Sequence, residues 1–155
     1  MPAVRRRYVI AAIGAGLVLF LVVRALLARA FNVGDAENAA ITALVQAEAR
    51  GDSAEVISLI SHCRSSATCR ARAVEVTAAL RHPGKVAIAE INPSSTFSIG
   101  STQGTARVAW VAGSSRPRVQ CLHVRHAGSV VQGFTIELLK VSRRIASDAD
   151  CPGRF

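Results

Sequence analysis

The chain begins with an apolar segment that is long enough to cross a lipid bilayer. Residues 8–27 contain one charged side chain, Arg24, and directly follow Arg5, Arg6 and Arg7. At about 1.5 Å of helical rise per residue, this segment spans roughly 30 Å, the thickness of the hydrocarbon core of a bilayer. The arginines before the segment outnumber Arg24 and Arg29 around its far end, so the N-terminus is predicted to stay in the cytoplasm and the rest to be exported.

Residues 1–30 therefore form an Arg-rich cytoplasmic stub with a transmembrane signal anchor, or else a signal peptide. The small residues of Ala28-Arg29-Ala30 fit a signal-peptidase site, with cleavage after Ala30. Against cleavage, the apolar run is longer than the hydrophobic region of a usual signal peptide. The sequence favours a retained anchor in the cytoplasmic membrane, with residues 31–155 as one extracytoplasmic domain, and leaves a secreted protein as the alternative.

The net charge of +9 does not indicate a nucleic-acid-binding protein. Five of the 19 Lys and Arg residues precede residue 35, which leaves 14 cations against 10 acidic residues in the remainder. These cations are scattered, and only 5% of the residues are aromatic side chains that could stack on bases. We expect no nucleic-acid partner.

The first half of the exported domain has helical periodicity. Residues 31–34 are predicted to form a hinge, after which Asp35 caps a helix that ends at Gly51. Asp52, with Glu55 three residues later, predicts the start of a second, short helix that ends near His62.

A third helix is predicted from Ser65 or Ser66 to the Pro83-Gly84 pair. Beyond this pair the apolar period changes to two residues and β-branched residues become frequent. The predicted strands are residues 86–91, 105–112, 118–126 and 129–141, with a further short strand at 97–99 inside the loop 93–104.

The connections between the predicted strands are short enough for antiparallel hairpins, at residues 113–117 and at Ala127-Gly128. The last predicted strand has apolar residues on both faces, and Gly133 in its middle is where a curved sheet could bend. The sequence thus predicts an α+β fold in which three helices pack on a curved antiparallel sheet of about four strands, shaped like a cone.

This order of elements, together with the segment DAENAAITALVQAEARGDSAEVISLIS at residues 35–61, resembles the nuclear transport factor 2-like (SnoaL-like) superfamily. In that superfamily, N-terminal helices fill a cone made by a curved antiparallel sheet. Members with one N-terminal membrane helix and a small external domain are similar to two groups. These are the membrane proteins associated with mammalian-cell-entry lipid transporters and the assembly components of type IV secretion systems. The resemblance implies partners among envelope membrane proteins, or a homo-oligomer.

Four cysteines, all beyond residue 60, indicate disulfide bonds in an exported domain. Three pairings are possible, of which the spacing favours Cys63 with Cys69, across the loop between two helices, and Cys121 with Cys151, between a strand and the C-terminal tail. The alternative is a metal site built on Cys121 and His123, or on His62 and Cys63. Because CxxC spacing is absent, we expect disulfides and no metal or other cofactor.

Some members of the superfamily are isomerases or dehydratases that use carboxylates, His and Tyr inside the cone. The strand residues that could play such roles are Glu90, Glu137 and His123, but each carboxylate could equally be a solvated edge residue or a partner for Arg107 or Arg125. The only tyrosine, Tyr8, lies in the leader, and Trp110 is expected in the core. The sequence therefore predicts a non-catalytic, membrane-tethered binding or scaffolding domain. Its alternatives are a secreted small-ligand-binding protein and an isomerase- or dehydratase-type enzyme.

Overall fold

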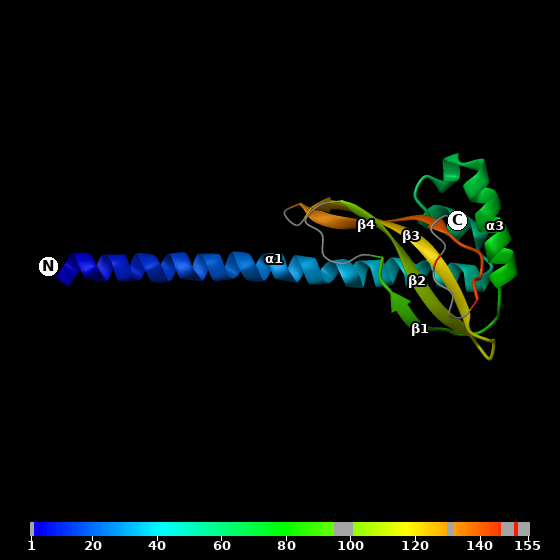
Figure 1. The fold of residues 1–155 in the computed structure, drawn as a ribbon, viewed down its shortest axis with the longest axis horizontal. Helices are drawn as coiled ribbons and strands as arrows, with labels where there is room; N and C mark the ends of the chain where they lie inside the picture. The colour runs from blue at the N-terminus through cyan, green and yellow to red at the C-terminus, as the bar shows by residue number, and fades with distance from the viewer. Residues whose placement is uncertain (1, 95–100, 130–131, 147–150, 152–155) are drawn as a thin grey trace.

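A computed structural model describes residues 2–94, 101–129, 132–146 and 151, with the backbone alone for residues 2–7, 9–12 and 29–32. The short strand predicted at residues 97–99 lies outside the described residues. The fold is α+β, with an apolar N-terminal helix and a four-stranded antiparallel sheet with helices (Figure 1). Its elements in chain order are α1 (Pro2–Arg50), α2 (Ser53–Leu59), η1 (Cys63–Ser65, a 3-10 turn), α3 (Ala67–Leu80), β1 (Val86–Asn92), β2 (Thr102–Ala112), β3 (Arg118–Ser129) and β4 (Gly133–Val141).

The N-terminal helix α1 is continuous across the segment that was expected to be a hinge. Residues 31–34 are helical, and Asp35 lies inside the helix instead of capping its start, so both predictions were wrong. This segment contains no proline, and one glycine in a helix costs only about 1 kcal/mol relative to alanine. The helical preference of the flanking residues is sufficient to carry the helix through Gly34.

The two halves of α1 differ in what surrounds them. Side chains in the first half, such as Leu17, Phe20 and Leu21, are 56–60% exposed. This part of α1 is long and apolar enough to cross a membrane. In the second half, Ile41 and Leu44 are fully buried. Figure 1 shows the first half projecting away from the sheet and the second half lying against it.

The two helices after α1 begin where the sequence predicts. Gly51, at φ 79°, ends α1, and the Asp52 carboxylate accepts the Glu55 N–H at 2.9 Å at the start of α2. The hydroxyl oxygen of Ser66 accepts the Cys69 N–H at 3.3 Å at the start of α3. The second helix ends at Leu59, earlier than expected, because Ile60 becomes extended and pairs with β4.

The sheet has the order β1-β2-β3-β4, and every neighbouring pair is antiparallel. The last hairpin differs from its prediction. Ala127 and Gly128 are paired with Thr135 and Phe134 inside the ladder, so the turn lies beyond Ser129. Gly133 begins β4 instead of bending its middle, and the irregularity of this pair is a register shift between His123 and Val124.

The core lies between the second half of α1 and one face of the sheet. Trp110 on β2 is fully buried there, as expected, together with Leu122 and Val124 on β3. On the opposite face of β3, Cys121 is also fully buried. Around Cys121, β3 is therefore covered on both faces, whereas only alternate residues of β2 are buried.

Gly51→Ala is expected to lower the free energy of unfolding of the domain by about 1–2 kcal/mol. The added Cβ would sit at positive φ and 2.7 Å from Cδ of Arg81. The fluorescence of the single, buried Trp110 during urea unfolding provides the measurement.

Gly34→Ala is the matched control, because no atom lies within 4 Å of its added Cβ. This variant should be as stable as the parent or more stable by up to about 1 kcal/mol. A larger loss at position 34 than at position 51 would contradict the continuous helix.

Candidate functional site

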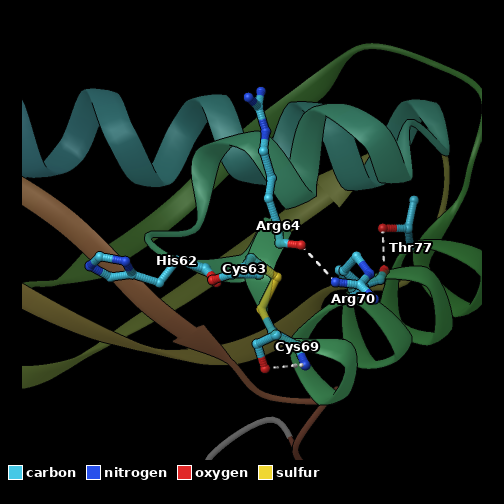
Figure 2. The surroundings of a disulfide bond; sticks show 9 residues. His62, Cys63, Arg64, Cys69, Arg70 and Thr77 are labelled. Carbon is cyan, nitrogen blue, oxygen red and sulfur yellow. Dashed lines mark hydrogen bonds between the residues drawn. A yellow bond between two sulfur atoms is a disulfide. The ribbon is translucent and has the colours of Figure 1, made fainter.

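The first disulfide joins η1 to the first turn of α3. Cys63 and Cys69 are bonded, with their Cα atoms 5.2 Å apart, and a guanidinium N–H of Arg70 donates to the carbonyl of Arg64 at 2.6 Å across the same loop. Figure 2 shows the His62 and Arg64 side chains pointing away from the disulfide in different directions. His62 has φ 59°, in the left-handed region that a non-glycine residue rarely adopts. The bridge thus holds a sharply turned segment at the surface.

The second disulfide attaches the C-terminal segment to the sheet. Cys121 on β3 is bonded to Cys151, with 5.6 Å between their Cα atoms. Before it reaches Cys151, the chain continues along β3: the Ser142 N–H donates to the Cys121 carbonyl and the Ser142 hydroxyl accepts the Cys121 N–H, both at 2.9 Å. The Ile145 N–H donates to the Val119 carbonyl at 2.8 Å. These backbone contacts continue the pairing along β3 after β4 ends, and the bridge attaches the segment that follows to Cys121.

All four cysteines are therefore in disulfides, and their sulfurs are not available as thiolate ligands. This removes the donor from both metal pairs considered above, Cys121 with His123 and His62 with Cys63. Within the described part of the chain, no three His, Cys, Asp or Glu side chains are grouped as metal ligands.

The structure does not bring the three catalytic candidates together. Glu90 is exposed on β1, at one edge of the sheet, whereas Glu137 lies on β4 at the other edge. Glu137 forms an ion pair with Arg125 across β3 and β4, with 2.8 Å between Nε and Oε2. His123 is half-buried and pairs in register with Lys140. Their arrangement is that of a sheet surface, without a shared site.

A buried polar contact that the sequence analysis missed connects α1 to β3. The carboxylate of Glu37, only 1% exposed, lies 2.7 Å from Nε2 of His126 and accepts the Ser94 N–H at 2.8 Å. The Ser94 hydroxyl is 3.5 Å from the same His126 nitrogen. This cluster fixes the helix to β3 and to the segment that follows β1.

A second buried carboxylate, Glu48, lies about three turns further along α1 than Glu37. Neither of its oxygens has a well-aligned hydrogen bond in the described part of the chain. Beside it, the Trp110 indole N–H donates to the Gln120 side-chain oxygen at 2.8 Å. Burial raises the pKa of Glu48 to about 8, and the interaction with the Gln120 side chain acts weakly in the opposite direction. At neutral pH this carboxyl is therefore largely protonated.

The spacing of Glu37 and Glu48 could have revealed their burial. Positions 37, 41, 44, 45 and 48 follow one another at intervals of three, four and one, which places them on one face of a helix. The hinge expected at residues 31–34 would instead place Glu37 in the first turn of a helix, where the helix dipole favours a carboxylate.

Two surface grooves lie near the end of α1 and around α3. One, of about 380 Å³, runs between the start of α3 and β4. The other, of about 700 Å³, lies where α1 and α3 end and contains Arg50, Arg81, His82 and Lys85. Both grooves present cationic side chains, so the surface around α3 is suited to a negatively charged partner.

Comparison with known proteins gives no match for this chain among family models, curated proteins or solved structures.

Glu48→Gln should remove part of the pH dependence of stability. Between pH 4.5 and about 8, the folded state keeps a proton on Glu48 that the unfolded chain loses. The free energy of unfolding of the parent should therefore fall as pH rises, by up to about 1.4 kcal/mol per pH unit relative to Glu48→Gln, and level off above this range. Urea unfolding at several pH values measures this difference.

The control for this experiment is Glu90→Gln, at an exposed position on β1. Its stability should run parallel to that of the parent across the same pH range. If Glu48→Gln also ran parallel to the parent, the carboxyl of Glu48 would not be protonated in the folded state.

Removal of each disulfide by paired Cys→Ser substitution should destabilise the domain unequally. The two bridges close segments with sequence separations of 6 and 30 residues. The chain-entropy relation then gives about 2.4 kcal/mol for Cys63–Cys69 and about 3.7 kcal/mol for Cys121–Cys151. Urea unfolding of the two double variants tests the order, and an equal or inverted order would show that strain or residual structure dominates over loop entropy.

Proposed function

We propose that this chain is a non-catalytic, membrane-tethered extracytoplasmic domain that binds or scaffolds other proteins of a bacterial envelope assembly. The observation that carries the proposal is the shared helix. The same helix α1 supplies a segment that is long enough to cross a membrane and, without a break, the central helix of the domain core. A domain built in this way presents its surfaces at a fixed position relative to the membrane.

The length of α1 indicates how far the domain lies from the membrane surface. The helix has 49 residues, which corresponds to about 74 Å. If residues 8–27 span the bilayer, the part of α1 that follows extends roughly 35 Å beyond it. A rigid arm of this length suits a protein that must meet a partner at a set distance from the membrane.

The disulfides support an extracytoplasmic location for the domain. Both bridges lie in the part of the chain that follows α1, and such bonds persist in oxidising compartments. With Arg5 to Arg7 on the cytoplasmic side, the topology that agrees with both features has the N-terminus inside and the sheet outside.

The interior of the domain favours binding over catalysis. In the proposed relation to the nuclear transport factor 2-like superfamily, α1 fills a cone formed by the sheet, where enzymes of the superfamily hold their substrates. Here Trp110, Gln120 and Glu48, each fully buried, occupy that position between α1 and the sheet. We therefore place the binding surface on the outside of the domain.

A secreted ligand-binding protein of the same fold is the second candidate. Cleavage after Ala30 would leave the core residues of α1, from Glu37 onward, in the mature domain. The continuous helix supports the retained form, since a protease acting at Ala30 would have to cleave within helical backbone. An isomerase- or dehydratase-type enzyme is a third candidate, which the separation of Glu90, Glu137 and His123 in the sheet makes less favoured.

The test is a crosslinking experiment in native membranes with a C-terminal tag on the full chain. The expected result is a bait that begins at its own N-terminus, is joined to other envelope proteins, and has a mass lower by four hydrogen atoms than the all-thiol chain, because it has two disulfides. The tag should be accessible to protease added outside the cytoplasmic membrane. A bait that begins at Phe31 and is recovered alone would contradict the proposal and favour the secreted form.

A further inference from the structure

The groove between β4 and α3 lies along an open edge of the sheet. In the order β1-β2-β3-β4, β4 has a neighbouring strand on one side only. On its other side, Ile60 makes a single parallel bridge with Leu138, and the Ser61 N–H donates to the Leu138 carbonyl at 2.7 Å. Beyond Leu138, the outer side of β4 borders the groove, which is lined there by Leu139, Lys140 and Val141.

The chain turns away from β4 at His62, and this turn opens the groove. His62 has φ 59° and is the only non-glycine residue with positive φ among the described residues. The next residue, Cys63, is held by its disulfide to α3 (Figure 2). The pairing that Ile60 and Ser61 begin along β4 therefore stops after one bridge, and the described residues form no further bridge with residues 139–141 on that side.

The shape of the groove fits an extended peptide. Ile60, Ala73 and Val141 provide apolar lining, and the volume is about 380 Å³. An extended chain on the edge of a sheet gains affinity from main-chain hydrogen bonds and specificity from alternate side chains that enter adjacent pockets. The apolar lining suits one set of these alternate side chains.

The charge of the groove favours acidic residues at the remaining alternate positions of such a peptide. Arg72, Lys140 and His62 line it, and within the described part of the chain no carboxylate does. Glu75 contacts Arg72 at 3.5 Å, but its shorter contact, 2.5 Å, is with Arg143. Positive charge around the groove favours acidic side chains on the partner.

The position of the groove identifies the class of partner. Figure 1 shows α3 at the opposite end of the molecule from the N-terminus, with most of α1 between them. Screening by salt confines electrostatic attraction to about 10 Å, so headgroups of the membrane that holds the N-terminal part of α1 are beyond reach. A protein partner is the source of acidic groups that fits this location.

We propose that the groove along β4 binds an extended acidic segment of a partner protein, which pairs with residues 139–141 and continues the parallel pairing begun by Ile60 and Ser61. This inference names the binding surface of the proposed envelope-binding function and rests on that function. The acidic side chains of the occupant face Arg72 and Lys140, and the apolar side chains that alternate with them face the apolar lining at Ile60, Ala73 and Val141.

The experiment uses the full chain in phosphatidylcholine nanodiscs. Short random peptides displayed on phage are selected on these nanodiscs, and the enriched peptides are synthesised and titrated by fluorescence anisotropy. We expect enrichment of peptides that alternate Asp or Glu with apolar residues. The double variant Arg72→Glu/Lys140→Glu should bind these peptides at least about tenfold more weakly than the parent. Added salt should weaken peptide binding to the parent.

Two further variants test whether the peptides bind in the β4 groove and not through the general positive charge of the domain. Thr68→Trp fills the groove from an exposed position without a change of charge, and it should also weaken binding. Arg81→Glu/Lys85→Glu makes the same change of charge in the other groove and should leave binding unchanged. Unfolding curves of each variant show whether the domain is intact.

The proposal is overturned if no peptide is enriched over nanodiscs without protein, or if the control double variant loses binding as much as the groove variant. It is also overturned if the groove variant instead loses binding to added vesicles of phosphatidylglycerol, which would identify a lipid surface as the occupant. Failure here leaves the membrane-tethered topology intact, because protease accessibility in native membranes tests that separately.

Discussion

The burial of one face of α1 against the sheet is the interaction on which the rest of the structure depends. Ile41, Leu44 and Val45 are fully buried in this interface, opposite Trp110 and other inward-facing residues of β2 and β3. Burial of each large apolar side chain contributes roughly 1.5–3 kcal/mol. The smaller helices α2 and α3 complete this core from the end of α1. One disulfide joins η1 to α3, and the other joins the C-terminal segment to β3.

Two carboxylates interrupt this apolar interface, and their environments differ. Glu37 is matched by His126 and the Ser94 N–H, so that its burial is offset by hydrogen bonds. Glu48 is buried without comparable partners, and because burial of a charged carboxylate is unfavourable, it retains a proton. A chain that keeps an acidic side chain at such a position is less stable at higher pH than one with a neutral isostere.

Much of the fold could be predicted from local sequence signals. The caps at Asp52 and Ser66 could be predicted because a short polar side chain before a helical segment can accept an N–H group that the first turn leaves unpaired. The strands followed from alternation and β-branched residues. Two bounds were wrong, for different reasons. At residues 31–34 a single glycine without a proline does not end α1. At Ala127-Gly128, pairing with β4 extends the ladder over a glycine that usually marks a turn.

The site was harder to predict than the fold. Cysteine spacing suffices to propose bridges, but the burial of Glu37 and Glu48 becomes visible only once α1 is treated as one helix. The groove along β4 depends on the left-handed turn at His62 and on a contact between residues 60 and 138, and neither has a local sequence signature.

In the proposed membrane-tethered arrangement, the unbroken backbone of α1 also couples the domain to rotation of its N-terminal half. Each residue of an α-helix advances the chain by about 100° around the helix axis. The direction in which the β4 groove faces is therefore set by the face of the membrane segment that contacts its neighbours, and a partner that turns one end of α1 would turn the other. A segment joined through a flexible linker would lose this angular information, whereas the continuous α1 carries it from its apolar N-terminal half to the end that lies beside α3.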